Sequence, residues 1–149
     1  GKTETSRLLL KSFVDLGSGT PGKKGTKLST SIPASFFILD SFGHAQTASN
    51  SNASRFGRYS EVQFSDKGRL VGLKGLEYYM EKSRVTGASA GERNFHAFYY
   101  LIAGANQEER TYLSLDHATT FRYLSHHRGS ATTSPADAHR FNQLKDAFK

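Results

Sequence analysis

Apolar side chains recur at helical spacing at several places along the chain, with polar stretches between them. From Leu9, apolar residues fall at i, i+1, i+4 and i+5 and form one stripe along the first segment. The same pattern predicts a short, mostly buried helix around Asp40 and a helix rich in Phe and Tyr beyond residue 90. The predicted helices are residues 3–16, 32–42, 90–103 and 135–148, with a short polar helix near 107–115.

Capping residues fit the ends of these helices. Ser89 and Glu92 have capping-box spacing at the start of the third helix, where each satisfies free backbone N–H groups. Ser134 is a good N-cap for the last helix, and Pro135 is a good first helical residue. The residues expected to end helices are Gly17, Gly43 and Gly104.

Two runs of alternating polarity predict a β-hairpin within residues 58–80. The runs at 58–65 and 69–80 flank Asp66-Lys67-Gly68, which has the composition of a turn. The pattern at 78–80, at the end of the second run, is that of a helix start. The predicted loops are 17–31, which is rich in Gly and Lys, 46–57 and 125–134.

Composition narrows the class of protein. The 149 residues contain no Cys, which excludes a disulfide scaffold, a thiolate zinc site and a Cys nucleophile. No apolar run approaches the roughly 20 residues of a membrane helix, so we expect no membrane span in this stretch. The net charge of +7 suits nucleotide phosphates, nucleic acid, acidic lipid or an acidic protein surface, and does not choose among them.

For the Lys-rich segment, three histidines and an aromatic cluster, the sequence favours a structural role over a binding site. The Lys-rich residues 17–31 can contact an anion, but charge runs are more often solvated loops. His126, His127 and His139 match no standard metal-ligand spacing. The aromatic residues within 95–100 can stack on bases, but their helical spacing favours core packing.

The first three residues have the chemistry of a phosphate site. Gly1-Lys2-Thr3 matches the end of G-x-x-x-x-G-K-[ST], where backbone N–H groups hold phosphates at a helix N-terminus. In that loop the Lys reaches the β- and γ-phosphates and the hydroxyl binds Mg²⁺. A tripeptide also occurs by chance, and it is the predicted helix directly after it that favours the phosphate loop.

A second polar segment, residues 50–57, follows about fifty residues later in a predicted loop before a strand. It offers two Asn amides that can reach phosphates and a hydroxyl that can join a Mg²⁺ shell. Its Arg can stabilise transferred charge or bind a carboxylate. A polar turn with no ligand is the alternative interpretation.

Several ordered motifs together resemble the myosin motor domain, and they cover essentially the whole chain. The matching segments are 3–6, 39–47, 50–58, 79–85, 91–99 and 120–124. The Lys-rich residues 17–31 stand where myosins have their first variable surface loop.

The resemblance implies a role for each matching residue. The implied nucleotide-binding residues, from the P-loop end at 1–3 and the first switch at 50–57, are Gly1, Lys2, Thr3, Glu4, Asn50, Asn52, Ser54 and Arg55. Thr3 and Ser54 are the implied Mg²⁺ ligands. Arg55 and Asn52 have the implied catalytic roles, Arg55 by pairing with a Glu of the second switch.

Two departures from the myosin pattern point to a particular branch. Ala53 stands where a Ser usually helps to place the attacking water, and Arg58 stands where Lys is usual. With these departures the chain is similar to the motor-like domain of fungal chitin synthases. In that family the head precedes a membrane-embedded glycosyltransferase that makes chitin from UDP-N-acetylglucosamine (UDP-GlcNAc), and none of its catalytic motifs falls within these residues.

The resemblance therefore implies an incomplete α/β fold of the P-loop NTPase, myosin motor type, with a mixed sheet and flanking helices. The implied function is that of an ATP-binding fragment of a chitin synthase head, with ATP and Mg²⁺ as cofactors. Because both termini look cut, we expect a larger parent enzyme and an inactive fragment. The implied further partners are actin, through parts of the head outside this chain, UDP-GlcNAc at the parent's transferase domain, and a membrane only through the parent.

Location and alternatives follow from the same resemblance. The implied location is the plasma membrane or secretory vesicles of fungal hyphal tips and septa, with the head cytoplasmic. One alternative is a fragment of a stand-alone unconventional myosin ATPase. Another, motivated by Ala53, is a non-hydrolysing tether that depends on actin or nucleotide. A nucleic-acid binder rests on charge alone, and we expect no nucleic-acid partner.

Overall fold

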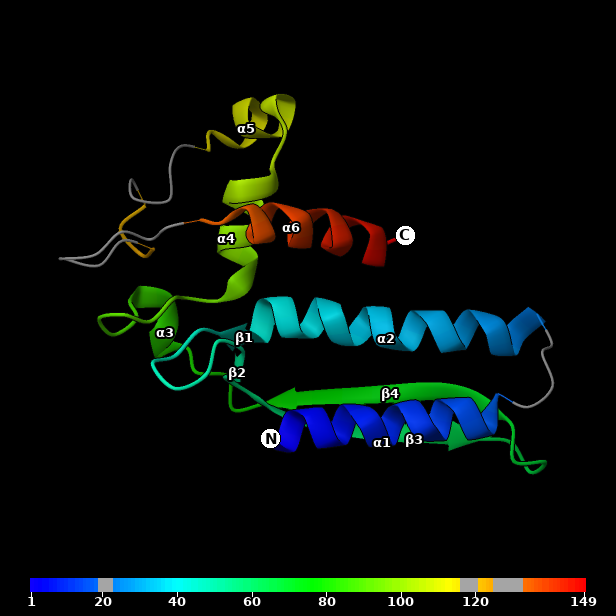
Figure 1. Cartoon of the computed structure of the whole chain (residues 1–149). Helices are drawn as coiled ribbons and strands as arrows, with labels where there is room; N and C mark the ends of the chain where they lie inside the picture. Colours follow the sequence, from blue (N-terminus) through cyan, green and yellow to red (C-terminus); the bar gives the residue numbers. More distant parts are fainter. Residues whose placement is uncertain (19–22, 116–120, 125–132) are drawn as a thin grey trace.

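The computed structural model describes residues 1–18, 23–115, 121–124 and 133–149, with the backbone only at 23–26. Two long helices lie along a β-hairpin, and shorter helices gather at one end of them (Figure 1). In chain order the elements are α1 (Lys2–Gly17), α2 (Lys23–Gly43), β1 (His44–Ala45), β2 (Ala53–Ser54), β3 (Gly57–Phe64), β4 (Leu70–Tyr78), α3 (Ser83–Thr86), α4 (His96–Gly104), α5 (Gln107–Leu113) and α6 (Pro135–Ala147).

The main hydrophobic core lies between α1, α2 and the hairpin. Its buried members are Leu10, Val14, Ile32, Phe36 and Leu70. Burying side chains of this size contributes roughly 1.5–3 kcal/mol each. Because α2 leads directly into β1, this core also fixes the N-terminus of α1 beside the segment that joins β1 to β2 (Figure 1).

Among the described residues each strand pairs with its neighbour in sequence, and Ala45 of β1 also forms an isolated antiparallel bridge with Phe95. β3 pairs antiparallel with β4 from Gly57 opposite Tyr78 to Phe64 opposite Leu70, so the hairpin expected within 58–80 is present. The helix start expected at 78–80 is wrong, because β4 runs to Tyr78 and Tyr79 has a φ of 52°.

The mixed sheet is not found among the described residues. β1 and β2 form a second antiparallel pair, separate from the hairpin. Parallel strands need a long crossover connection, whereas both of these pairs are joined by a short one.

A second layer is formed by α4 and α6, with α6 lying along α2 (Figure 1). Tyr99 and Ile102 of α4 are buried together with Leu124, and Phe121 packs against them. The last residue of α4, Gly104, lies against Phe141 of α6. A Cβ at this glycine would stand 2.4 Å from the Phe141 Cβ, so the close helix contact requires Gly.

Gly104→Ala is expected to destabilise the protein by about 1–3 kcal/mol through overpacking at the α4–α6 contact. The measurement is chemical denaturation of the variant beside the unaltered protein. Gly87→Ala is the matched control, because a Cβ at Gly87 meets nothing within 4 Å and its φ of 167° is extended backbone. Equal denaturation midpoints for Gly104→Ala and the unaltered protein would contradict the packing argument.

The loop expected at 17–31 is wrong for most of its length, because α2 begins at Lys23. Its Gly, Ser and Thr content lowers helix propensity, but tertiary packing overrides propensity. Leu28 packs partly buried against the main core and anchors the early turns of α2. Pro33 stands inside the helix. The exposed Lys27 fits the solvated interpretation of the charge run.

The helix expected at 90–103 begins later than the pattern predicts, at His96. Asn94 is 1% exposed, and its side chain donates to the backbone oxygens of Val85 and Tyr123, at 3.1 and 3.0 Å. Such side-chain bonds to the backbone compete with helix formation. The capping box is also wrong, because the N-cap is Phe95, and no side chain makes a capping hydrogen bond there.

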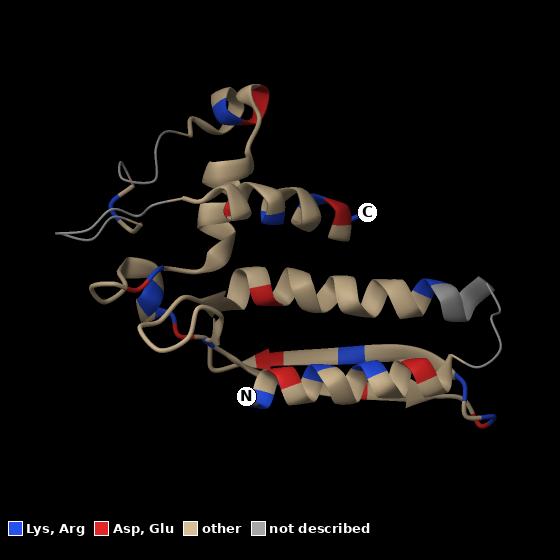
Figure 2. Cartoon of the chain, in the orientation of Figure 1, with Lys and Arg blue, Asp and Glu red and all other residues tan. Residues whose placement is uncertain are grey.

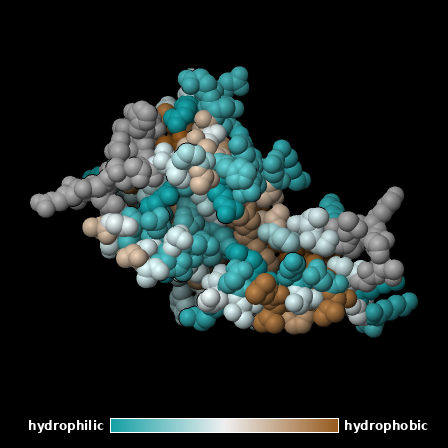
Figure 3. Space-filling model, in the orientation of Figure 1, coloured by the Kyte–Doolittle hydropathy of each residue, from teal (hydrophilic) through white to brown (hydrophobic). Residues whose placement is uncertain are grey.

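The remaining helices follow their patterns more closely. α1 covers the expected 3–16, but its stripe divides between two faces: Leu10 and Val14 are buried, while Leu9 and Phe13 are exposed. Figure 3 shows hydrophobic residues gathered over α1. α5 and α6 lie where expected, and Ser134 caps α6 in a capping box with Asp137.

Candidate functional site

The residues implied by sequence meet around one cavity. The cavity has a volume of about 460 Å³ and lies between the N-terminus of α1 and the β1–β2 segment. Its lining residues are Gly1, Lys2, Thr3, Glu4, Arg7, Asn50, Asn52, Ala53, Ser54 and Arg55. All eight residues assigned to nucleotide binding are in this set, although the two groups are about fifty positions apart in sequence. The tertiary structure therefore brings residues 1–4 and residues from 50–55 together at one cavity.

The N-terminus of α1 offers free backbone donors to this cavity. Gly1 is the N-cap, and no side chain caps the N–H groups of the first turn. The first N–H groups of a helix have no partner within it and carry the positive end of the helix dipole. Lys2 adds a full positive charge at the same point, as Figure 2 shows by the basic residue at the start of α1. This end of α1 is suited to an anion.

The two asparagines of the cavity both have their amide oxygens engaged by the protein. Asn50 Oδ1 accepts from the backbone N–H of Asn52 at 2.9 Å. Asn52 Oδ1 lies 3.0 Å from His44 Nδ1 and 3.1 Å from His96 Nε2. With the oxygens engaged, the NH₂ groups are the donors these side chains have to offer to a ligand.

Ser54 lies on β2, which is held against β1 by antiparallel pairing of Ala53 with Ala45 and of Ser54 with His44. The Ser54 hydroxyl donates to the Phe56 carbonyl oxygen at 2.9 Å. A hydroxyl whose proton points away keeps its lone pairs for another partner. Ala53 is 6% exposed and brings only a methyl group to the cavity wall.

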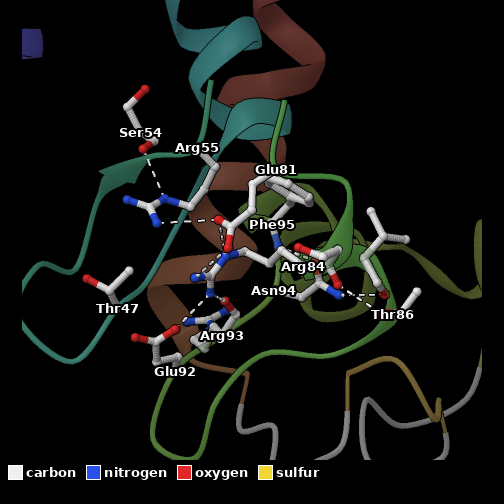
Figure 4. Close-up of polar contacts among 12 residues, drawn as sticks. Thr47, Ser54, Arg55, Glu81, Arg84, Thr86, Glu92, Arg93, Asn94 and Phe95 are labelled. Atoms are coloured by element: carbon white, nitrogen blue, oxygen red, sulfur yellow. Dashed lines mark hydrogen bonds and ion pairs between the residues drawn. The ribbon is translucent and has the colours of Figure 1, made fainter. Parts of the chain in front are cut away.

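Arg55 is held both by its neighbour Ser54 and by a chain of ion pairs that begins at Glu81 (Figure 4). Its Nη1 contacts Glu81 Oε2 at 3.3 Å, and its Nε donates to the Ser54 carbonyl oxygen at 2.9 Å. Arg84 lies between two carboxylates: its Nε is 2.9 Å from Glu81 Oε2, and its Nη1 is 3.0 Å from Glu92 Oε2. The implied partner of Arg55 is a Glu of the second switch, and the carboxylate it meets in this chain is Glu81.

The pKa values of these groups follow from their partners. Hydrogen bonds from Arg84 hold the pKa of both Glu81 and Glu92 below the ordinary value, and for Glu92 the Ala48 backbone N–H adds to this. Burial acts to lower the pKa of Arg84, but its hydrogen bonds to the two carboxylates raise it overall. These groups therefore stay charged at neutral pH. Through Glu92 and Glu81 they hold the two ends of the cavity loop, Ala48 and Arg55, to Arg84 of α3.

Asp40 of α2 is a second junction beneath the cavity. It is 6% exposed and pairs with Arg7 of α1, which lines the cavity and also contacts Glu4 at 3.0 Å. His44 Nε2 lies 3.2 Å from Asp40 Oδ1, and Arg58 Nη1 lies 3.9 Å from the same oxygen. One buried carboxylate thus joins α1, α2 and β3, and it contacts the cavity residue Arg7 directly.

Sequence reasoning did not find the supporting residues Arg7, Asp40, Glu81 and Arg84. The i, i+3 spacing of Glu81 and Arg84 is a signal of an ion pair. Nothing in the sequence shows that Arg55 joins them. His96 is packed and hydrogen-bonded: it is 8% exposed, and its ring stacks on Tyr100.

The structure can be searched for metal sites and membrane-spanning helices only in the part of the chain that it describes. His126 and His127 lie outside the part of the chain that the structure describes. Among the described residues, no group of three or more His, Cys, Asp and Glu is placed to hold a metal ion. None of the helices described is both long and apolar enough to cross a membrane.

Comparisons with a family model and with curated proteins both relate the chain to myosin motor domains. The model of the family described as "Myosin head (motor domain)" matches residues 1–149. Chitin synthase 8 of Mycosarcoma maydis is 51% identical over 149 residues, which are 100% of this chain and 7% of that protein. Chitin synthase 5 of Cryptococcus neoformans var. grubii is 47% identical over 150 residues, 100% of this chain and 8% of that protein. Myosin-2 of Arabidopsis thaliana is 38% identical over 148 residues, 99% of this chain and 12% of that protein.

Proposed function

Because the chain belongs to the myosin head (motor domain) family, we propose that it binds ATP with Mg²⁺ in the cavity between α1 and β2. The observation that carries the proposal is the convergence of Lys2, both asparagines and Arg55 on the donor-rich N-terminus of α1. Cationic and N–H donors from two distant segments meet there, and Glu4 is the one acidic side chain among the described residues that line the cavity.

The phosphates belong at the start of α1. Lys2 and the first backbone N–H groups of the helix bind phosphate oxygens, and charge-assisted hydrogen bonds of this kind are about twice as strong as neutral ones. The NH₂ groups of Asn50 and Asn52 add donors from the opposite wall. Arg55, held by Glu81, keeps its charge beside them.

The hydroxyls of the cavity suit Mg²⁺. This ion prefers oxygen ligands and keeps several waters, so one or two protein hydroxyls with phosphates are a sufficient ligand set. Thr3 and Ser54 supply those hydroxyls, and the Ser54 proton is directed to Phe56, which leaves its lone pairs for the ion. When bound, MgATP supplies the phosphoryl group and the charge that these residues orient.

The parent protein is proposed to be a chitin synthase whose head this chain helps to build. The support is the identity to two fungal chitin synthases, which exceeds the identity to myosin-2. The chain spans 7–8% of those two relatives, so transfer from UDP-GlcNAc belongs to other parts of the parent. Actin binding by the head, and a position at the plasma membrane or on secretory vesicles of hyphal tips and septa, complete the proposal.

The test is equilibrium titration of the complete head with a fluorescent ATP analogue, with Mg²⁺ and with EDTA. Saturable binding that weakens in EDTA is expected. Titration with an oligonucleotide at low salt provides the contrasting arm, since a nucleic-acid binder would bind there and lose affinity steeply as salt rises. Absence of nucleotide binding by the head would overturn the proposal.

Ala53→Ser is expected to raise ATP turnover about tenfold, since one added hydrogen bond to an attacking water contributes about 1–1.5 kcal/mol. Ala53 is buried in the cavity wall, one residue before Ser54. Phosphate release in the presence of actin measures the effect, and nucleotide affinity should stay within about twofold. Ala48→Ser, an exposed position in the same loop, is the matched control.

The same assay examines a second candidate function, a tether that binds nucleotide without turnover, which the missing hydroxyl at Ala53 favours. Nucleotide binding by the unaltered head with phosphate release at background supports the tether. Rapid turnover by the unaltered head that Ala53→Ser leaves unchanged would contradict both the tether and the role given to Ala53.

A further inference from the structure

Two buried imidazoles converge on one atom of the cavity loop. Asn52 Oδ1 lies 3.0 Å from Nδ1 of His44 and 3.1 Å from Nε2 of His96. His44 is 1% exposed and lies on β1, while His96 is 8% exposed and opens α4. Asn52 itself is exposed. Buried side chains from β1 and α4 therefore both contact the amide oxygen of Asn52, a residue that is itself exposed to solvent.

Both imidazoles are themselves held in place. His44 lies 3.2 Å from the buried Asp40 carboxylate and packs its ring near Phe56, with centroids 5.8 Å apart. His96 stacks on Tyr100 with centroids 5.7 Å apart and planes 11° from parallel. Neither ring can turn away from Asn52 without breaking these contacts, so the amide oxygen has two fixed neighbours.

Burial makes these contacts costly to lose. It lowers the pKa of His44 and lowers that of His96 to about 4, so His96 is a neutral imidazole at pH 7 that retains one N–H. In the tautomer with its proton on Nε2, His96 donates to the Asn52 oxygen, and a buried N–H that lost this acceptor would be unfavourable.

We propose that His44 and His96 are positioning residues that fix the Asn52 amide with its oxygen inward and its NH₂ toward the nucleotide phosphates. The inference rests on the proposed nucleotide site. Among the described residues, Asn52 Nδ2 has no hydrogen bond within the protein, so both of its N–H groups remain for a ligand. Asn50 is oriented in the same sense by the Asn52 backbone N–H, at 2.9 Å from Oδ1. The two histidines thus decide whether this wall of the cavity donates to a phosphate or repels it.

The test is a double-mutant cycle on the affinity of the complete head for a fluorescent ATP analogue. His96→Phe keeps an aromatic ring but removes the N–H, and Asn52→Ala removes the amide. Each single variant is expected to weaken binding about tenfold. The double variant is expected to bind as weakly as Asn52→Ala alone, because His96 acts through the Asn52 amide. His96→Gln and His44→Asn each keep an N–H donor near the lost position and are expected to restore binding to within about twofold of the unaltered head. His139→Gln, at an exposed position of α6, is the matched control.

Asn52→Asp separates positioning from folding. The carboxylate still accepts from both imidazoles but has no NH₂, so an unchanged melting temperature with at least tenfold weaker ATP binding is expected. Additive losses in the cycle, or unaltered affinity in His96→Phe or Asn52→Asp, would overturn the inference. If His96→Phe fails to fold, Asn52→Asp and His96→Gln still decide it. An unaltered head that binds no nucleotide would instead remove the proposed function, which keeps the two failures distinct.

Discussion

Replacing Lys2 with Ala is expected to lower the affinity of the complete head for ATP by a factor of roughly 10²–10⁴. Lys2 lines the cavity at the N-terminus of α1, where no side chain caps the free N–H groups. Its ammonium group is placed to reach two phosphates, and each charge-assisted hydrogen bond contributes about 1.5–3 kcal/mol. Loss of both corresponds to the stated factor, since each 1.4 kcal/mol is tenfold in affinity.

The measurement is titration with a fluorescent ATP analogue in Mg²⁺. Lys27→Ala is the control, because it removes the same charge from an exposed position of α2 away from the cavity. Lys2→Ala should leave the melting temperature unchanged, since Lys2 is exposed and belongs to no ion pair among the described residues. Binding as tight as that of the unaltered head would refute the assignment of residues 1–3 to a phosphate loop.

Replacing Arg84 with Met is expected to cost about 2–3 kcal/mol of stability. Arg84 is 6% exposed and neutralises Glu81 and Glu92 together. Breaking a buried pair costs about 3–5 kcal/mol, and we expect less here because Glu81, at 36% exposure, regains water. Glu81, the direct partner of Arg55, loses the guanidinium that positions it, so ATP affinity should fall as well.

Denaturation midpoints as a function of pH measure this effect. Because Arg84 lowers the pKa of both carboxyl groups, their contribution to stability is present above the ordinary Glu pKa and is lost as pH falls through the lowered values. The unaltered protein should therefore lose stability on acidification below about pH 4.5 more steeply than Arg84→Met does. Arg69→Met, in the exposed hairpin turn, is the control. Parallel pH profiles for the Arg84 variant and the unaltered protein would contradict the role given to Arg84.

Local patterns predicted most of the elements in the described part of the chain, for identifiable reasons. The hairpin and α6 were evident because turn and cap chemistry is local: Asp66-Lys67-Gly68 makes the turn, and Ser134 with Pro135 starts the helix. The errors arose where distant contacts outweigh local preference. Leu28 on the core extends α2 through a stretch of poor helix formers, and the bonds of Asn94 delay the start of α4.

The candidate site divides in the same way. The residues proposed to contact the nucleotide could be predicted from sequence, because a phosphate site requires particular residue types at a fixed spacing, as in Lys2-Thr3. The groups that hold them were not, because a partner such as Glu81 for Arg55, or Asp40 for Arg7, lies far along the chain. No periodicity encodes such a pairing.

By itself, the sequence determined the family, through ordered motifs whose chemistry is written in residue identity and spacing. It also predicted which side chains are proposed to contact a nucleotide. Only the tertiary structure decided that residues 1–4 and 50–55 share one cavity and that the Asn52 oxygen is held by His44 and His96. The physical reason is that orientation of a side chain depends on the donors packed around it, and those donors come from elements that the chain brings together only on folding.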